Sequence, residues 1–371
     1  MIKVSVLISV YNGEAHLQEA VESILGQTFS DFEFVIVDDG STDSTWQILK
    51  AYAAQDSRIV LIRNEKNIGL ERSLNKGLAL TQGEYIARQD ADDVSLPQRL
   101  ELQSHFLDIH PEVGALGTAV KIIDKQGASQ DEDYLPVDHE SIEALLLVNN
   151  FLHHSTLMTR RHLMQTLKGY DESMRHAEDY DIWWRLSRIS RLATMPDILL
   201  CRRIDDSPRI SKLYREKQLQ NALKISIKAV KESLGNNSTS LDEEAYQRFW
   251  WTYLRLLDKE AYERFWYAYH GQNAQLQWQD IQSLWPFWQL LATHPGGHQI
   301  WGPRLRSLAH DLLRRRHTVE GLQLLLIVAR QFKTPIQLLR VVKSLIKPYV
   351  PARSYQLQNS QQLKHTSKVT N

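Results

Sequence analysis

The stretch FVIVDDGSTDST, from Phe34 to Thr45, decides the fold of the amino-terminal half of the chain. Its first four residues are apolar and predict a buried β-strand, which ends at two adjacent carboxylates, Asp38 and Asp39, before Gly40. A carboxylate beside a glycine turn can accept hydrogen bonds from a planar donor edge, such as that of uracil or guanine. It can equally bind turn amides and cap the next helix. The stretch alone leaves both roles open.

Strands and helices alternate around this stretch. VSVLISV (Val4–Val10) predicts a first strand, and apolar residues at helical spacing over 17–25 predict a helix that ends at Gly26. The same patterns predict further strands at 59–63, 84–93 and 113–124, and helices after Thr42 or Asp43, over 73–83 and from Pro97 to about His110. This alternation predicts an α/β fold with right-handed crossovers, a mainly parallel sheet and flanking helices.

A second acidic cluster, DADD (Asp90–Asp93), follows the predicted strand at 84–93. Neighbouring carboxylates repel one another, and a divalent cation such as Mg²⁺, held by one or two carboxylates and substrate phosphates, removes that conflict. An acidic loop with Ser95 capping the next helix is the other interpretation. Ligands of parallel sheets bind outside the carboxyl ends of the strands. We therefore expect both acidic clusters to line one crevice.

The composition is typical of a globular protein of about two domains. The chain has 371 residues, of which 43% are hydrophobic and 24% are charged. Its single cysteine, Cys201, excludes an internal disulfide and fits a reducing compartment. No apolar run reaches the roughly 18 residues that would span a bilayer. We interpret the first residues as a strand and not as a signal peptide, and we expect a cytoplasmic protein.

The net charge is unevenly distributed along the chain. Residues 1–110 hold 9 basic and 17 acidic residues, a net charge of −8, whereas residues 304–371 hold 13 basic and 2 acidic residues, a net charge of +11. Residues 304–347 mix Leu, Val and Ile with Lys and Arg at helical spacing, which predicts peripheral association with an anionic membrane surface. An ordinary helical bundle with a solvated basic face is the alternative. Nucleic acid is not expected as a partner, because the acidic half would repel phosphates.

From about residue 211 onward, helical periodicity replaces the strand pattern. GNNSTS (Gly235–Ser240) is a predicted linker, and seven of the ten tryptophans lie in 250–301. We expect these tryptophans to fill a helical core, although stacking on sugars and contact with a membrane interface are alternatives. The segment 351–371 is predicted to be disordered.

Four blocks of the sequence, in order, carry a family resemblance: VSVLISVYNGE, ILGQTFSDFEFVIVDDGSTDST, NEKNIGLERSLNKGLALTQGEYIARQDADDVSLPQRLE and AEDYDIWWRL. They resemble the inverting family-two glycosyltransferases with the GT-A fold. The resemblance implies a GT-A catalytic domain over 1–210, with a nucleotide-sugar half over about 1–110 and an acceptor half over about 111–210. A helical region over 211–350 would follow, with the tail beyond it.

The resemblance also implies roles for single residues. Asp179 matches the catalytic base, Asp39 the carboxylate that reads the base of the nucleotide, and Asp92, with Asp90, the ligands of Mn²⁺ or Mg²⁺. Many members have a histidine where this sequence has Asp205 and Asp206, which puts a third protein ligand to the metal in doubt. Other positions expected near the nucleotide sugar are Ser9, Tyr11, Asn67, Asn75, Arg88 and Arg203, and positions expected on the acceptor side are Glu178 and His154. The alternatives are an ion pair in the acidic crevice for Arg88, turn and helix-capping roles for the two asparagines, and a structural role for His154 with His153.

The implied reaction is one in-line displacement at the anomeric carbon of a nucleotide sugar, with UDP as the expected nucleotide. A hydroxyl of a glycan or lipid-linked acceptor attacks while the diphosphate leaves, with help from Asp179 as general base. Asp179 begins a predicted helix, whose N-terminus favours an ionised carboxylate. The acids at this position could instead merely offset the helix dipole. Two alternative functions are a nucleotide-sugar pyrophosphorylase, whose glycine-rich triphosphate loop is replaced here by SVYNGEAH, and an inactive relative that acts as a binding scaffold.

Overall fold

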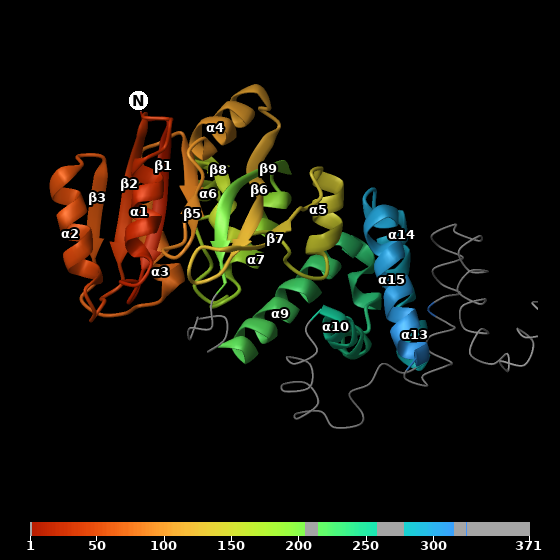
Figure 1. Ribbon diagram of the computed structural model, residues 1–371. Coiled ribbons are helices and arrows are strands. Elements are labelled where there is room, and N and C mark those ends of the chain that lie inside the picture. The colour runs from red at the N-terminus through yellow and green to blue at the C-terminus, as the bar shows by residue number, and fades with distance from the viewer. Residues whose placement is uncertain (1, 205–213, 258–277, 315–323, 325–371) are drawn as a thin grey trace, which may run out of the picture.

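The computed structural model describes residues 2–204, 214–257, 278–314 and 324. A mixed sheet forms the amino-terminal part, and helices that follow it in sequence gather on the side remote from strand β3 (Figure 1). Within the described residues the sheet has nine strands in the order β3-β2-β1-β4-β8-β6-β9-β5, and β7 pairs with β6.

From β1 to β6 the strands and helices alternate as the sequence predicts, whereas β5, β7, β8, β9, α5 and α6 were not predicted. The strands are β1 (Val4–Val10), β2 (Phe32–Asp38), β3 (Ile59–Arg63), β4 (Tyr85–Arg88), β5 (Val94–Ser95), β6 (Val113–Ile123), β7 (Ser129–Asp133), β8 (Met158–Arg160) and β9 (Arg191–Arg203). The helices among them are α1 (Leu17–Leu25), α2 (Thr45–Gln55), α3 (Leu70–Leu78), α4 (Arg99–Ile109), α5 (His139–Leu146), α6 (Arg161–Thr166), α7 (Glu178–Ser187) and the short 3-10 helix η1 (His154–Thr156). The later helices are α9 (Arg215–Leu234), η2 (Gly235–Ser240), α10 (Glu243–Leu257), α13 (Trp278–Ser283), α14 (Trp285–Thr293) and α15 (Gly297–Arg314).

Strands β3, β2, β1 and β4 are mutually parallel and confirm the predicted α/β class. The strand predicted at 84–93 is shorter than expected, because β4 ends at Arg88 and the acidic cluster is a loop. Strand β8 is antiparallel to β4 and β6, and β7 is antiparallel to β6, whereas β6 and β9 are parallel. The antiparallel strands β7 and β8 were not predicted, since their segments are short and polar or only partly apolar.

The alternation of side chains along the strands explains the two layers of helices. Val6 and Ile8 of β1 lie in a core cluster with apolar residues of α1, α2 and α4. Leu7, between them, points to the other face and joins a cluster with residues of α3, α5 and α7. Strands buried on both faces are nearly all apolar, as VSVLISV is. The sheet is therefore covered by helices on both sides.

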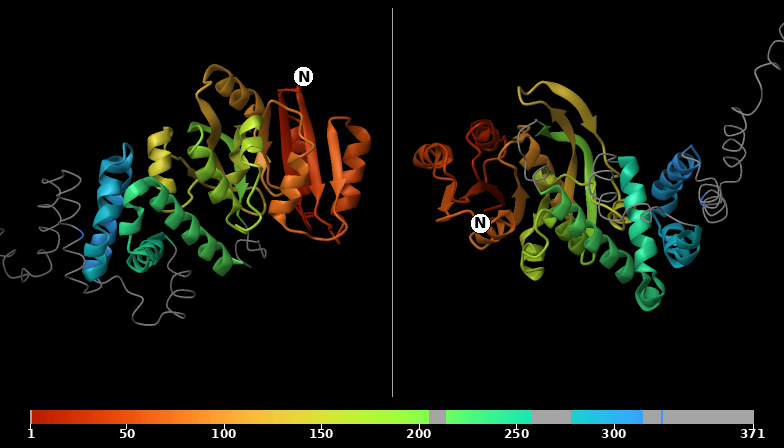
Figure 2. Two further views of the ribbon diagram at one scale, coloured as in Figure 1. Left: turned by 180° about the vertical axis from the view of Figure 1, so that it is seen from behind. Right: turned by 90° about the horizontal axis from the view of Figure 1, so that it is seen from below.

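The second of these clusters continues into the later helices. It runs from Leu7 through Trp183 of α7 to Trp250 of α10 and Trp301 of α15. The views in Figures 1 and 2 agree that α9, α10 and α13–α15 pack together beyond α5. Trp250, Trp251, Trp288 and Trp301 are buried, which confirms the expected core role for these four tryptophans. GNNSTS forms η2, an exposed short helix between α9 and α10.

The described part of the predicted membrane-binding segment belongs to this core. Leu305, Leu308 and Ala309 of α15 are fully buried, so their apolar face packs inside the protein. Most of 304–347, and the predicted disordered tail at 351–371, lie outside the described residues. In the part of the chain that the structure describes, no helix is long and apolar enough to cross a membrane.

Gly40, directly after the two carboxylates, lies in a turn that packs closely against residues 66 and 67. Its φ is +73°, and an added Cβ would lie 2.5 Å from the carbonyl carbon of Lys66. We expect Gly40→Ala to lower the free energy of unfolding by more than about 2 kcal/mol, because it adds a backbone clash to left-handed strain. Urea denaturation measures the change.

Gly127→Ala is the matched control. Gly127 has a φ of +84°, but an added Cβ would meet nothing within 4 Å. We expect this variant to lose only about 1 kcal/mol, from the backbone strain alone. Equal losses in the two variants would contradict the close packing of this turn against residues 66 and 67.

Candidate active site

The two acidic clusters lie at the same edge of the sheet, as the sequence predicted. In the parallel pairing of β1 with β2, Val10 lies opposite Asp38. On the other side of β1, strand β4 ends at Arg88, which pairs with Leu7. The loop at 90–93 therefore leaves the sheet beside β1, and so does the turn that begins at Asp39.

Both carboxylates of the first cluster hold turn amides. Asp38 is fully buried, accepts a hydrogen bond from the amide of Ser41 at 3.0 Å and pairs with Arg63 at 3.1 Å. One oxygen of Asp39 accepts from the side chain of Asn64 and from the amide of Ile68, each at 2.9 Å. Its other oxygen accepts from the amide of Gly69 at 3.0 Å. A carboxylate offers about four acceptor positions, so Asp39 can take one further donor.

One hydroxyl links two carboxylates of the second cluster, and the amide of Arg203 binds Asp93 Oδ1 at 2.9 Å. The Oγ of Ser155 lies 2.6 Å from Asp90 Oδ2 and also in hydrogen-bond contact with Asp93 Oδ2. One hydroxyl hydrogen cannot serve both carboxylates, so one carboxyl group must carry a proton. Burial, together with the charges of Asp92 and Asp90, raises the pKa of Asp93 to about 7. Although burial opposes it, the charge of Arg88 at 2.6 Å holds the pKa of Asp90 down to about 2. Asp93 is therefore the carboxyl group that takes up a proton more readily than Asp90.

Arg203, at the end of β9, fixes the loop from the other side. Its buried guanidinium donates to the backbone oxygens of Asp92, Asp124 and Lys125 at 3.0–3.1 Å and pairs with Glu19 of α1. A contact between Arg203 and a diphosphate, as predicted, would require some of these bonds to be exchanged.

Asp179 lies at the first turn of α7. One of its oxygens accepts from the amide of Tyr180 at 2.8 Å, and the other accepts from the side chain of Asn150 at 2.9 Å. Burial raises the pKa of Asp179 above the ordinary range, the charge of Asp90 adds to this effect, and the two hydrogen bonds oppose it. The position of Asp179 at a helix N-terminus, taken alone, predicts a lowered pKa. Because the charge of Asp90 acts on Asp179, the predicted base on α7 lies close enough to the acidic loop to interact with it.

Two buried charged groups in this region lack hydrogen-bond partners for part of their polar atoms. Arg88 is 1% exposed and Glu178 is 6% exposed. Within the described part of the chain, Nε and Nη1 of Arg88 and Oε2 of Glu178 have no hydrogen-bond partner. Burial and the charge of Asp179 raise the pKa of Glu178 well above its ordinary value. Unsatisfied buried polar atoms of this kind are uncommon in native structures.

His154 adjoins these groups. Burial and the charge of Arg88 lower the pKa of His154 to about 3, so its imidazole is neutral at neutral pH. Its Nε2 lies 2.9 Å from the hydroxyl of Tyr170. The site beside Asp90 therefore contains a neutral imidazole and a phenol next to the unsatisfied Arg88.

The remaining predicted residues lie at or near the same edge. Ser9 is buried in β1, and Tyr11, which follows that strand, is 47% exposed. Asn67 is exposed, next to the amides that bind Asp39. Asn75 instead joins α3 to the acceptor half, because its side chain makes two hydrogen bonds to the backbone of Tyr170 at 2.8 and 2.9 Å.

Three residues of the site were missed by sequence reasoning. Ser155, Asn150 and Asn64 each bind one of the predicted carboxylates. Ser155 and Asn150 lie in the segment NNFLHHST, where only the histidines suggested chemistry. Pairing of β8 with β4, which was not predicted, places that segment beside the acidic loop.

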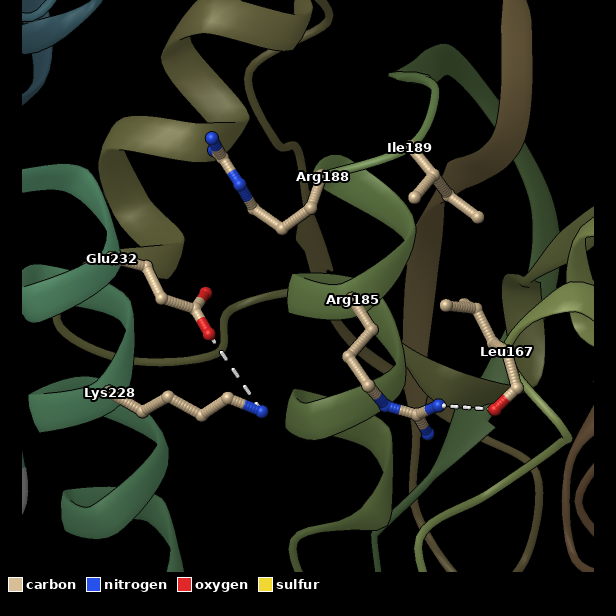
Figure 3. A pocket seen from close by; sticks show the side chains of 6 residues that line it. All are labelled: Leu167, Arg185, Arg188, Ile189, Lys228 and Glu232. Carbon is tan, nitrogen blue, oxygen red and sulfur yellow. Dashed lines mark hydrogen bonds and ion pairs between the residues drawn. The ribbon is translucent and has the colours of Figure 1, made fainter. Parts of the chain in front are cut away.

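A pocket of about 400 Å³ lies elsewhere, between α7 and α9. Figure 3 shows interactions of two of its basic side chains, Lys228 and Arg185, and the third, Arg188, pairs with Glu143. Lys228 lies 4.0 Å from Glu232, and Arg185 binds Asp181 and the carbonyl of Leu167. The pocket adjoins the carboxyl-terminal end of α7, whereas Asp179 lies at the opposite end of that helix.

Comparison with known proteins identifies the family of the chain. The sequence profile of the family described as "Glycosyl transferase family 2" matches residues 5–167. The chain is 42% identical over 186 residues to the "Putative glycosyltransferase EpsE" of Bacillus subtilis, a match that covers 49% of this chain and 66% of that protein. It is 32% identical over 199 residues to the "Amylovoran biosynthesis glycosyltransferase AmsE" of Erwinia amylovora, covering 53% of this chain and 74% of that protein.

A solved structure has a similar fold. The crystal structure of S. aureus TarS 1-349 in complex with UDP-GlcNAc superposes with a TM-score of 0.57 at 18% identity, and the match covers 88% of this chain and 90% of that one. At this identity the likeness concerns the fold alone, and it confirms the predicted GT-A architecture followed by a helical region. The sequence matches show more: this chain belongs to glycosyltransferase family 2 and is a glycosyltransferase.

Proposed function

We propose that this glycosyltransferase moves a sugar from a UDP-linked donor to a hydroxyl of a glycan or lipid-linked acceptor, with inversion at the anomeric carbon. The observation that carries the proposal is the group of unsatisfied polar atoms on Arg88 and Glu178. Arg88 interacts electrostatically with Asp90, and Glu178 interacts in the same way with Asp179. Leaving such atoms buried without partners costs about 1–3 kcal/mol each. The phosphates and hydroxyls of a nucleotide sugar would supply the missing partners.

The nucleobase would lie at the first acidic cluster. The carboxylate of Asp39 is fixed by three hydrogen bonds and keeps the capacity to accept one more. Uracil offers its N3–H as a donor. UDP is also the nucleotide in the TarS complex, whose fold is similar.

A divalent cation fits the second cluster. The carboxylate oxygens of Asp92 and Asp90 are ligands that suit Mg²⁺ and Mn²⁺. Burial of Asp93 is the main cause of its raised pKa, and the negative charges of Asp92 and Asp90, which a cation would offset, add to it. Among the described residues, no group of three or more His, Cys, Asp or Glu side chains could hold a metal, so the substrate and water would complete the ligand set. A bound cation would neutralise charge that develops on the leaving diphosphate.

Asp179 would take the proton from the attacking hydroxyl. Its carboxylate is oriented by two hydrogen bonds, and its raised pKa makes it a better base than an ordinary aspartate. Because the base must be ionised, turnover is expected to fall as the pH drops through this raised pKa. Glu178, next to Asp179 in the sequence, would face both the sugar and the acceptor, and His154, beside Arg88 and Asp90, would contact the acceptor.

The acceptor is proposed to be a growing polysaccharide of the cell envelope. AmsE is named for amylovoran biosynthesis, and it is one of the relatives that share the catalytic region. Association with the cytoplasmic face of a membrane remains a proposal that depends on basic residues beyond Arg314, since the apolar face of α15 is already buried.

The role of Asp179 is tested by Asp179→Asn. We expect this variant to lose about 100-fold or more in turnover, because the amide cannot take a proton. Thermal stabilisation by UDP and Mn²⁺ should persist. UDP release from a panel of UDP sugars measures the turnover, and Glu172→Gln, at an exposed ion pair with Arg72, is the control. Turnover equal to that of the wild type would remove Asp179 from the mechanism.

The role of Asp92 is tested by Asp92→Ala. The wild-type protein should gain thermal stability from UDP with Mn²⁺ and much less from UDP with EDTA. In the variant we expect the two increments to be equal, because the cation loses its ligand. The matched control is Asp131→Ala on the exposed strand β7. A metal-dependent increment that survives in Asp92→Ala would place the cation elsewhere, and the absence of any increment in the wild type would favour an inactive scaffold.

A further inference from the structure

We infer that Asn150 is a positioning residue for Asp179, and that the helices beyond residue 214 hold Asn150 in place by binding the end of α5. The inference deepens the proposed function, because it depends on Asp179 as the base. It assigns the helical region a part in the active site, which neither the family resemblance nor the sequence comparisons assign.

The side chain of Asn150 can face Asp179 in one orientation only. Its Oδ1 accepts a hydrogen bond from the amide of Leu152 at 2.9 Å, so its Nδ2 must point the other way. There, Nδ2 donates to Asp179 Oδ2 at 2.9 Å, with a longer contact of 3.3 Å to the carbonyl of Leu152. The backbone at 150–152 therefore determines where the donor stands, and the position of that backbone determines the position of the carboxylate.

The backbone just before Asn150 is the carboxyl-terminal end of α5. The last carbonyls of a helix have no partner within the helix and need donors from elsewhere. Here the donors are buried side chains of other helices. The indole of Trp301 donates to the carbonyl of Ala144 at 2.7 Å, and the hydroxyl of Tyr180 donates to the carbonyl of Leu146 at 2.6 Å. The hydroxyl of Ser226 donates to the carbonyl of Leu147 at 3.0 Å, and the indole of Trp250 donates to the carbonyl of Val148 at 2.6 Å.

Three of these four donors come from the later helices. Ser226 belongs to α9, Trp250 to α10 and Trp301 to α15. The carbonyl of Val148 lies only two residues before Asn150. The helical region therefore holds the backbone in place directly before Asn150, whose side chain binds Asp179. It also reaches the other side of Asp179, because Asn221 of α9 donates to the carbonyl of Arg175 at 2.9 Å, four residues before the base.

The charges that face Asp179 explain why one amide donor matters. Asp90 from the acidic loop, Glu178 beside it and Tyr170 from the segment before α7 face its carboxyl group. The charge of Asp90 disfavours the ionised form of Asp179, whereas the N–H of Asn150 favours that form. Removing the donor should therefore make Asp179 harder to ionise as well as less well oriented.

The first test requires no substrate. The carboxyl carbon of Asp179, labelled with ¹³C and assigned by its absence from Asp179→Asn, is titrated by NMR in the full chain. In Asn150→Ala we expect the titration to move to higher pH. Asn149→Ala, which removes the same side chain one position away, should leave it unchanged. A merely structural role of Asn150 would lower the melting temperature without moving the titration, and that result would overturn the inference.

The second test concerns the helices. Trp250→Phe and Trp301→Phe each keep a buried ring but remove the N–H donor to α5. We expect the amides of 145–152 to exchange hydrogen about 5-fold faster or more in each variant, because a buried carbonyl loses its partner. Trp288→Phe is the matched control, since that equally buried indole donates at 2.8 Å to Ile281, within the helical region. Equal exchange at 145–152 in all three variants would overturn the inference.

These results are separable from the failure of the proposed function. If Asp179→Asn keeps wild-type turnover, Asp179 is not the base, whatever the NMR titration shows. If Asp179→Asn is inactive and Asn150→Ala shifts neither the titration nor the turnover, Asp179 stays the base and only the positioning role falls. In the supporting case, turnover in Asn150→Ala falls about 10-fold at neutral pH, since misplacement of a catalytic group costs this much or more.

Discussion

The carboxylates gathered at one edge of the sheet repel one another, and the structure of the site is largely the set of donors that makes this arrangement stable. Asp39 is held by Asn64 and two backbone amides, Asp90 by Arg88 and Ser155, and Asp179 by Asn150 and a helix amide. Where the donors do not suffice, a proton is taken up more readily, as on Asp93. Each donor is delivered by a different element. Packing of the strands and helices therefore determines the electrostatics of the site.

The helical region takes part in this packing and is not a separate appendage. One core cluster runs from the sheet through α7 to Trp250 and Trp301. The indoles of these two tryptophans bind the last carbonyls of α5, next to the residue that contacts Asp179. Tryptophan suits this task because it fills a large volume and also offers one donor at its edge. Deleting the helices would expose this apolar surface and would also release the segment that carries Asn150.

Much of the fold could be predicted from the sequence, because strong periodicity marks β1 to β3 and the helices between them. The acidic positions were also predicted, since parallel strands place their carboxyl ends at one edge. Ser155 and Asn150 could not be, because their role depends on pairing of β8 with β4 and on the end of α5, which are long-range contacts without a local signal. The tryptophans indicated a core by composition, but only the structure shows which carbonyls they bind. Arg203, predicted to touch a diphosphate, binds the backbone oxygens of Asp92 in the acidic loop and of Asp124 after β6, contacts that the sequence did not predict.

We propose that the nucleotide-sugar donor and the cation bind at the acidic edge of the sheet, beside Asp179. The most direct measurement is a crystal structure of the protein with UDP and Mn²⁺, using the anomalous signal of the metal. We expect the metal beside Asp92 and the uracil N3–H facing Asp39, with the diphosphate near Arg88. Nucleotide and metal bound elsewhere, for example in the basic pocket lined by Arg188 and Lys228, with the acidic edge left to solvent, would contradict it.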